Sequence, residues 1–463
     1  MEKAAAKAPG HDKKNFEREW CIPMKKKFFP AFGVILAMSV LLAGCKTTEP
    51  ETASVEEDQI IAAEDIFGDL STQTEETPAE VDEVEAEPAQ EVMTASTVSI
   101  VAVGDTLASN GTHKSGAYPD GTYNYDHIFA HTKDVISAAD LAIVNEEVML
   151  GGVELGLTGY PLFNAAYELG DSIAAAGFDV ILLASNHTID KGEKGFDNCI
   201  NFWRTNYPEI GIVGVNQTEE EVDDIYVTER GGITFAILNY TYGLNGLRMP
   251  SDRQYMVNLL EEDRVISDLK KADELADFVI VCPHWGTEYV YYATDYQKYW
   301  AQIFADYGAD LIVGTHPHVI EPVEWITGSN GNQCLCYYSL GNFSSNQNKA
   351  PRMLGAIMDV KVTSDEHGVY ISEYGVIPII NHENWSLAGL TTYLMSDYTE
   401  ELSRQNAILN NDSSWSLSFA QSLCEKVFGD LYTVGNRTVF APEYSTDYGT
   451  DIEGTAPSGE GQY

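Results

Sequence analysis

The sequence predicts an α/β fold in which a mixed sheet is covered by helices. Seven apolar runs of strand length recur between Val98 and Leu340, and polar or glycine-containing turns follow them. Stretches with helical periodicity lie between several of these runs. Strands that are apolar almost throughout and alternate with helices are typical of a sheet that is buried on both faces.

The predicted strands are short and rich in Val, Ile and Leu. In chain order they span residues 98–103, 141–144, 179–184, 233–240, 278–282, 311–314 and 334–340. Two later segments, 354–363 and 368–380, show more alternation of apolar and polar residues, which is typical of antiparallel strands. We therefore expect a sheet that is mixed, or doubled into two layers.

Three stretches with a helical period precede predicted strands, at residues 167–177, 263–276 and 294–308. A chain of 463 residues exceeds the size at which one core usually stops growing, so one large domain with appendages, or two domains, is expected. We assign the main domain to residues 98–390. The segment after it predicts one or two helices, and we assign a helical flank to residues 391–440.

A targeting signal is predicted near the start of the chain. The segment "MKKKFFPAFGVILAMSVLLAGC", residues 24–45, has three lysines, a short apolar core and small residues before Cys45. This order is typical of a secretory signal peptide. Its ending resembles a bacterial lipobox, which implies a lipid on Cys45 and an extracytoplasmic protein anchored to the membrane. A signal peptide with an unrelated cysteine, or a single-span anchor, is the alternative.

Three other segments are expected to lie outside the folded part. Residues 1–23 precede Met24, a second candidate start, and are interpreted as an extra extension. Residues 46–97 contain 16 Asp or Glu against one Lys and one aromatic residue, Phe67. Such a segment buries too little apolar surface to fold and predicts an extended, disordered tether. The acidic, Gly- and Ser-containing residues 441–463 predict a frayed tail.

The net charge excludes one class of partner. A formal charge of −44 repels phosphate backbones at long range, so we expect no nucleic-acid partner. The cysteines contain no CxxC pair, which argues against a structural zinc site. Five cysteines follow Cys45, an odd number for a disulfide framework, and we expect their thiols to be buried and inert. They are Cys199, Cys282, Cys334, Cys336 and Cys424.

Polar side chains follow six of the predicted strands. The segments are 104–105, 145–147, 185–187, 284–288, 314–318 and 341–342, and each contains an Asp, Glu, Asn or His. In open α/β sheets, ligands bind at the carboxyl ends of the strands. Any one segment alone is more typical of a turn or a helix cap. It is the recurrence at six strand ends that points to a site.

The side chains at these strand ends predict a divalent-metal site. Carboxylates, carboxamides and neutral imidazoles suit Mn, Fe, Zn or Mg, and no thiolate belongs to the set. Carboxylates that are gathered in one place are also costly without a cation to neutralise them. The motif "GTHPH", which contains His316 and His318, contributes two imidazoles from a single strand end.

The same motifs resemble those of a known family. The segments "VGDTLAS", "DLAIVNEE", "ASNHTIDKG", "VCPHWGTEY", "GADLIVGTHPHVIEPVE" and "YYSLGNF" occur in that order between Val98 and Ile380. Together they resemble the CapA-type poly-gamma-glutamate capsule proteins. That family is similar to the calcineurin-like metallophosphoesterases. The resemblance therefore implies a metallophosphatase-like α/β/β/α sandwich with a dinuclear metal site.

The resemblance also implies roles for individual residues. The metal ligands would be Asp105, Glu147, Asn186, His284, His316 and His318. His187 would polarise the substrate or donate a proton, and Glu288 is a second candidate for proton transfer. Asn145, Trp285 and Asn342 are further site residues. Leu107 stands where phosphoesterases usually carry a histidine, so the set lacks one ligand for a second metal.

Three functions are compatible with these residues. The first is a metal-dependent enzyme or accessory factor that acts on an anionic cell-surface polymer, poly-gamma-glutamate by the resemblance. The second is a non-catalytic component of a capsule synthesis and export complex. The aromatic segment "EYVYYATDYQKYW" suits that role if it lines a polymer-binding cleft, although a packed helix face also explains it. The third is a phosphoesterase, against which the absence of a histidine at Leu107 argues.

Overall fold

The computed structural model describes residues 95–384 and 389–432. The predicted signal peptide with Cys45, most of the tether and the predicted tail lie outside the described residues, as does the extension before Met24. The described residues include Ser96 and Thr97, the last two positions assigned to the tether, and these already belong to the first strand. Within the described part, no helix has the length and apolar character needed to span a membrane.

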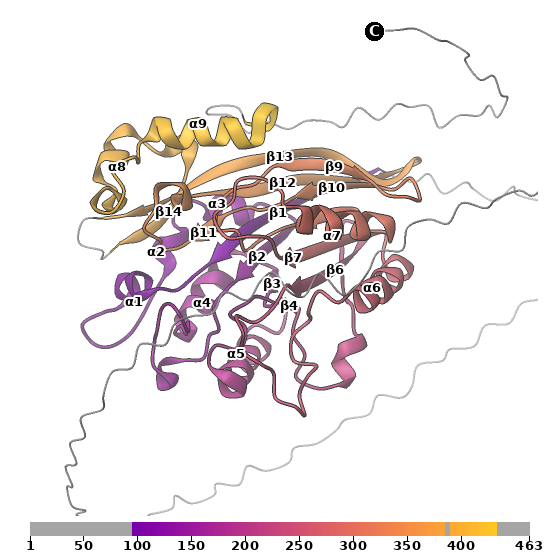
Figure 1. The fold of residues 1–463 in the computed structure, drawn as a ribbon, viewed down its shortest axis with the longest axis horizontal. Coiled ribbons are helices and arrows are strands. Elements are labelled where there is room, and N and C mark those ends of the chain that lie inside the picture. The colour runs from indigo at the N-terminus through magenta and orange to yellow at the C-terminus, as the bar shows by residue number, and fades with distance from the viewer. Residues whose placement is uncertain (1–94, 385–388, 433–463) are drawn as a thin grey trace, which may run out of the picture. The chain divides into compact units, whose positions relative to one another are not determined.

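The first sheet has eight strands and is mixed (Figure 1). Its strand order is β14-β13-β12-β1-β2-β3-β4, and β11 pairs with the end of β1. Strands β1 to β4 are parallel, whereas β12, β13 and β14 are antiparallel to their neighbours. The bounds are β1 Ser96–Thr106, β2 Leu141–Glu146, β3 Val180–Leu182, β4 Gly211–Val213, β11 Asn342–Ser344, β12 Leu354–Asp365, β13 Gly368–Glu383 and β14 Leu390–Leu394.

The second sheet has six strands in the order β5-β6-β7-β8-β10-β9. The four central strands are parallel, and an antiparallel strand closes each edge. The bounds are β5 Tyr226–Arg230, β6 Ile233–Thr241, β7 Phe278–His284, β8 Leu311–Val313, β9 Val323–Thr327 and β10 Gln333–Tyr337. All seven apolar runs predicted as strands are strands in the structure, and the two alternating segments form β12 and β13.

Alternating side chains of each strand enter different cores, which defines four layers. Ile100 of β1 packs with Ile237 and Ile280 of the second sheet, in the core between the two sheets. Val101, the next residue, packs instead with helix residues on the outer face of the first sheet. A third core lies between the second sheet and its own helices. The predicted α/β/β/α sandwich with mixed sheets is confirmed.

Helices cover the outer faces of both sheets. The short helix α1 Asn110–Gly116 precedes four helices that contribute to the core on the first sheet: α2 Asp126–Phe129, α3 Lys133–Ser137, α4 Tyr167–Ala176 and α5 Gly192–Asn206. Two helices, α6 Glu262–Leu275 and α7 Asp295–Asp306, cover the second sheet. On α7, Trp300 and Phe304 are buried while Tyr296 and Tyr299 stay exposed, so the aromatic segment is in part a packed helix face.

The C-terminal helical flank starts later than expected. Leu390–Leu394 forms β14, which pairs with β13 and extends the first sheet. The flank then consists of α8 Glu400–Gln405 and α9 Leu417–Phe428, which lies along β13 in Figure 1. The assignment of residues 391–394 to the flank is therefore wrong, because their alternating burial suits an edge strand. All five described cysteines are buried and unbridged, as expected.

Candidate metal centre

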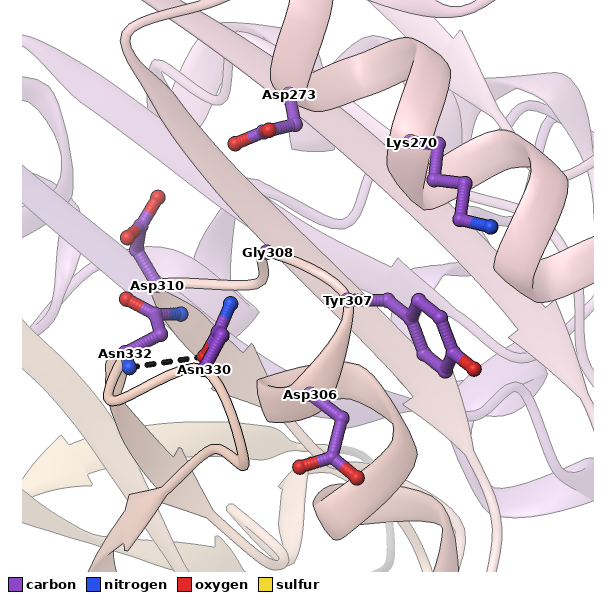
Figure 2. Close-up of a pocket in the computed structure, with 8 residues that line it drawn as sticks. All are labelled: Lys270, Asp273, Asp306, Tyr307, Gly308, Asp310, Asn330 and Asn332. Atoms are coloured by element: carbon purple, nitrogen blue, oxygen red, sulfur yellow. Dashed lines mark hydrogen bonds between the residues drawn. The ribbon is translucent and has the colours of Figure 1, made fainter.

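The second sheet has polar residues at both ends of its strands, and only one end matches the prediction. Asp310 directly precedes β8 and lines a pocket of about 440 Å³ together with residues of α6 and the end of α7 (Figure 2). None of the predicted site residues lines this pocket. Those residues follow the carboxyl ends of the strands, where the two sheets bring their loops together.

Asp105 connects several parts of the site. It lies near the end of β1 and is fully buried. Its Oδ1 accepts a hydrogen bond from the side-chain amide of Asn145 (2.8 Å) and one from the backbone amide of His316 (3.2 Å). Its Oδ2 lies 3.0 Å from Nδ1 of His318. Asp105 therefore joins the ends of β1 and β2 to the loop after β8.

Glu147 directly follows β2 and faces the histidines. Its Oε1 lies 3.5 Å from Nε2 of His284 and 3.7 Å from Nε2 of His318. Both carboxyl oxygens are buried and accept no hydrogen bond from the described residues. A buried carboxyl without partners is costly, and a cation is the partner that its position suits.

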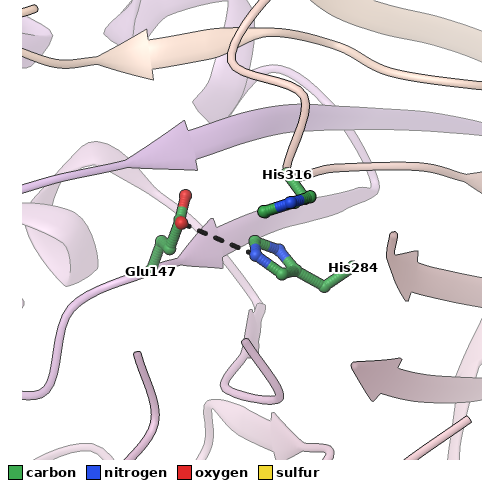
Figure 3. A group of neighbouring side chains, drawn as sticks. All are labelled: Glu147, His284 and His316. Carbon is green, nitrogen blue, oxygen red and sulfur yellow. Dashed lines mark ion pairs between the residues drawn. The ribbon is translucent and has the colours of Figure 1, made fainter. Parts of the chain in front are cut away.

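His284 and His316 form the other side of the centre. Nε2 of His284 lies 3.0 Å from Oδ1 of Asn186, and its Nδ1 lies 3.0 Å from the hydroxyl of Thr315. The ring of His316 lies 4.8 Å from that of His284, measured between centroids, and its Nδ1 is buried without a described partner. Figure 3 shows the carboxyl group of Glu147 directed toward both rings.

The possible metal-ligand atoms of these residues form two overlapping groups. Glu147, His284 and His316 each offer one ligand atom within 4.8 Å of the others, and so do Asp105, Glu147 and His318. Glu147 is common to both. The set of carboxylates and imidazoles, with unpartnered atoms on Glu147 and His316, fits a divalent metal with oxygen and nitrogen ligands.

In the second group, neighbouring charges shift the pKa values against the effect of burial. Burial alone would raise the pKa of Asp105, but the hydrogen bond and charge of His318 outweigh it and lower that pKa. Burial acts to lower the pKa of His318, yet Glu147 and Asp105 raise it to about 9. An ionised carboxylate and a cationic imidazole therefore stabilise each other there, and a metal bound through Nε2 of His318 would displace the proton on that nitrogen.

In the first group, by contrast, burial favours the neutral form of each side chain. Burial lowers the pKa of His284 to about 3 and the pKa of His316 well below its usual value. Both rings are neutral at pH 7, which is the form in which imidazole binds metals. Burial also raises the pKa of Glu147 well above its usual value, although the charge of His318 opposes this. A cation beside Glu147 would favour its ionised form.

His187 lies beside this centre with its ring held in place. Its Nδ1 lies 2.7 Å from Oδ2 of Asp190, and both side chains are buried. Its Nε2 lies 3.3 Å from the side-chain amide of Asn245, which also approaches Asn186. Since Asp190 can only accept at Nδ1, it fixes the tautomer in which Nε2 is free to accept a proton.

Backbone strain is concentrated at the same place. In the described residues, positive φ values outside glycine occur at Asn245 (51°), Tyr289 (69°), His316 (99°) and His318 (57°). Asn245 contacts His187, and the amide of Tyr289 donates to the carbonyl of Pro317, between the two histidines. Such conformations cost free energy and persist mainly where function requires a fixed geometry.

The structure brings together most of the predicted site residues. The six predicted ligands lie in one group, and Asn145 and Asn342 adjoin it, since Oδ1 of Asn342 lies 3.1 Å from Nδ1 of His318. Glu288 is exposed but close enough to influence the pKa of Glu147. Trp285 lies apart from the group: its ring stacks on Phe304, and its Nε1 donates to the carbonyl of Tyr338.

Four residues that contact the centre were not predicted from the sequence. Thr315 contacts His284, Asp190 holds His187, and Asn245 contacts Asn186. The ring of Tyr242 lies 4.6 Å from that of His316. Asp190 has a sequence signal, because it stands three residues after His187 within "SNHTID". The others lie on loops whose paths depend on the tertiary fold.

Comparison with known proteins identifies relatives of the folded part. Residues 99–347 match the family described as bacterial capsule synthesis protein PGA_cap. The chain is 31% identical over 209 residues to the PGA biosynthesis protein CapA of Bacillus subtilis (strain 168), covering 44% of this chain and 52% of that protein. It is 30% identical over 188 residues to the capsule biosynthesis protein CapA of Bacillus anthracis, covering 40% and 44%. The chain thus spans about half the length of these curated relatives.

The chain also has distant similarity to solved structures. The NAD nucleotidase of Haemophilus influenzae has a TM-score of 0.39 and 12% identity, with 72% of this chain and 60% of that chain covered. Such a score is too low to support an argument, so the layers rest on the strand order and the cores described above.

The fold and the centre together define a class of protein: a two-sheet α/β/β/α sandwich with buried carboxylate, carboxamide and imidazole groups where the strand ends of both sheets meet. Within that class, this chain belongs to the bacterial capsule synthesis protein PGA_cap family, whose match covers more than half of its length. The resemblance to CapA-type capsule proteins is confirmed.

Proposed function

We propose that this protein is a cell-surface lipoprotein that takes part in poly-gamma-glutamate capsule synthesis, export or processing through a divalent-metal centre. The observation that carries the proposal is the buried carboxyl of Glu147, which lies between His284 and His318 and accepts no hydrogen bond from the described residues. Membership of the capsule synthesis family supports the choice of polymer. The surface location follows from the signal-like residues 24–45 and the lipid expected on Cys45.

The ligands of the metal would be Asp105, Glu147, Asn186, His284, His316 and His318. A bound divalent cation would polarise a carbonyl or phosphoryl oxygen and lower the pKa of a bound water. The identity of the metal stays open among Mn, Fe, Zn and Mg. Asn342 and Asn145 hold His318 and Asp105 in place through their side-chain contacts.

His187 is the group of this chain best placed to move a proton. Its Nδ1 is held by Asp190, so that Nε2 accepts or releases the proton on the side of Asn186 and Asn245. Glu288 is exposed at the rim and is a second candidate for carrying a proton to solvent. Both proton-transfer roles are carried by side chains of this chain.

The test is a polymer assay with matched variants. Purified protein is incubated with poly-gamma-glutamate and added Mn²⁺, and polymer length is followed by gel filtration. Hydrolysis by the wild type and its loss in His316→Ala, at an unchanged melting temperature, supports a metal-dependent enzyme. The control is His367→Ala, which changes an exposed histidine in the β12–β13 turn.

Two other outcomes reject the enzymatic proposal. If the wild type leaves the polymer unchanged, and His316→Ala no longer captures the other proteins of the capsule synthesis complex, the protein is a non-catalytic scaffold. Rapid hydrolysis of a generic phosphomonoester or phosphodiester, with no effect on the polymer, would indicate a phosphoesterase.

A further inference from the structure

An arginine is stacked on a tyrosine at the edge of the metal centre. Cζ of Arg352 lies 3.4 Å from the centroid of the Tyr289 ring. The Tyr289 ring in turn lies 6.1 Å from the ring of His318, with an angle of 30° between their planes. The three side chains form a short stack that leads from a predicted ligand of the centre to the partly exposed Arg352.

Tyr289 and Arg352 are both linked to the loop that carries His316 and His318. The backbone amide of Tyr289 donates to the carbonyl of Pro317 (2.8 Å). The side-chain amide of Asn342 donates to the carbonyl of Arg352 (3.0 Å), while its Oδ1 lies 3.1 Å from Nδ1 of His318. Tyr289 holds a left-handed conformation, with φ of 69°, to make its contact. The position of the arginine is therefore tied to the position of the ligands.

The guanidinium of Arg352 has no carboxylate partner among the described residues. Of the four partly buried arginines described, the other three form ion pairs: Arg230, Arg253 and Arg264. The chain carries 71 Asp and Glu against 27 Lys and Arg, so partners are abundant. Glu288, the residue before Tyr289, also forms no ion pair with Arg352. An arginine kept unpaired in such a protein is available for an external anion.

The geometry suits an anion that offers two oxygens side by side, and the proposed polymer makes that anion a carboxylate. A guanidinium that stacks face-on against an aromatic ring keeps its N–H groups in a plane directed away from the ring. These groups match the two oxygens of a carboxylate in a bidentate arrangement. Tyr242, 40% exposed, lies against His316, and Tyr292, 66% exposed, stands three residues after Tyr289, so both offer further aromatic surface.

We infer that Arg352, held by Tyr289, is a specificity-determining residue that binds a carboxylate of an anionic polymer carrying one carboxylate per repeat unit. This contact places a neighbouring bond of the polymer beside the centre formed by Glu147, His284 and His316. It also offsets locally the repulsion that a net charge of −44 exerts on a polyanion. The inference rests on the proposed function, since it names how that polymer is recognised.

The test is direct binding of a fluorescent γ-linked glutamate oligomer, followed by fluorescence anisotropy. Arg352→Gln should bind about tenfold more weakly than the wild type, because a charge-assisted bidentate contact is lost. Arg352→Lys retains the charge without the planar fork and should lie between the two. The matched control is Arg404→Gln, an exposed arginine on α8, which should bind like the wild type. Metal content and melting temperature are measured for every variant.

The outcomes separate this inference from the proposal on which it rests. Equal binding by wild type and Arg352→Gln, with both folded, overturns the role of Arg352 and leaves the polymer assignment standing. No binding by the wild type overturns the polymer assignment and the inference together. Stronger competition by inorganic phosphate than by glutarate would show that the anion is a phosphate, and would overturn the carboxylate assignment. If Arg352→Gln does not fold, the same criteria apply to Arg352→Lys.

Discussion

At the residue scale, the centre depends on groups that are costly to bury unless something binds them. Glu147 belongs to both ligand groups and has two unpartnered oxygens, and His316 has an unpartnered Nδ1. Residue types at strand ends were enough to predict which side chains would gather. They were not enough to predict Thr315 or Asn245, since a single loop threonine or asparagine carries no pattern of its own. Nor could they place Trp285, whose ring is turned into the core although it follows His284 directly.

Asp190 provides a test of proton transfer at this scale. Asp190→Asn should keep the fold, because the amide oxygen can still accept from the backbone amide of Phe163. The same oxygen can also still accept from Nδ1 of His187, so the variant should lose only the negative charge of the pair, and it should slow polymer hydrolysis about 100-fold with an altered pH profile. Rates are measured across pH alongside metal content, which should not change.

The control for that variant is Asp197→Asn, on α5, where the carboxylate pairs with Arg253 and not with a site residue. It should leave the rate unaltered. A rate for Asp190→Asn equal to that of the wild type would remove the pair of His187 and Asp190 from the mechanism.

At the element scale, the apolar runs predicted strands correctly, whereas short elements at the sheet edges could not be predicted from the sequence. Strands such as β6 and β7 are apolar over many residues, because both of their faces are buried in cores. Strand β4 has only three residues, and β5 and β9 lie at sheet edges with partly exposed side chains, so their patterns are weak. Strand β14 was assigned to the helical flank for the same reason. Helix α5 begins with two glycines in four residues, which obscures its period.

The start of β8 offers a test of a partly buried charge away from the centre. Burial raises the pKa of Asp310 to about 7, while its Oδ2 accepts from the amide of Val279. The folded state therefore holds this proton more tightly than the unfolded state, and the wild type should lose stability as pH rises from about 4 to about 7. Asp310→Asn keeps an acceptor oxygen and removes the titration.

The free energy of unfolding of Asp310→Asn, relative to wild type, should thus rise between pH 4 and pH 8 by an amount on the order of a few kcal/mol. Urea denaturation at several pH values measures it. If the free energy of unfolding changes with pH in the same way for both proteins, the fold does not raise the pKa of Asp310, and the prediction is wrong.

At the scale of the whole molecule, two sheets that face each other allow six strand ends to meet. A single open sheet would present its strand ends in one row, whereas here β1 and β2 supply the carboxylates and β7 and the loop after β8 supply the imidazoles. The sequence predicted the type of fold from alternating patterns and the layer order from resemblance. The contacts between the sheets depend on the packing of many side chains, and no local pattern encodes them.

The central claim is that this buried group binds a divalent metal through Glu147, and elemental analysis of the purified protein tests it most directly. Wild type and His367→Ala should each carry about one equivalent or more of a divalent metal per chain after reconstitution. Glu147→Gln, which keeps the size of the side chain, should carry at least about tenfold less while remaining folded. A folded wild type that binds none of Mn, Fe, Zn or Mg, or a Glu147→Gln variant that retains its metal, would contradict the account.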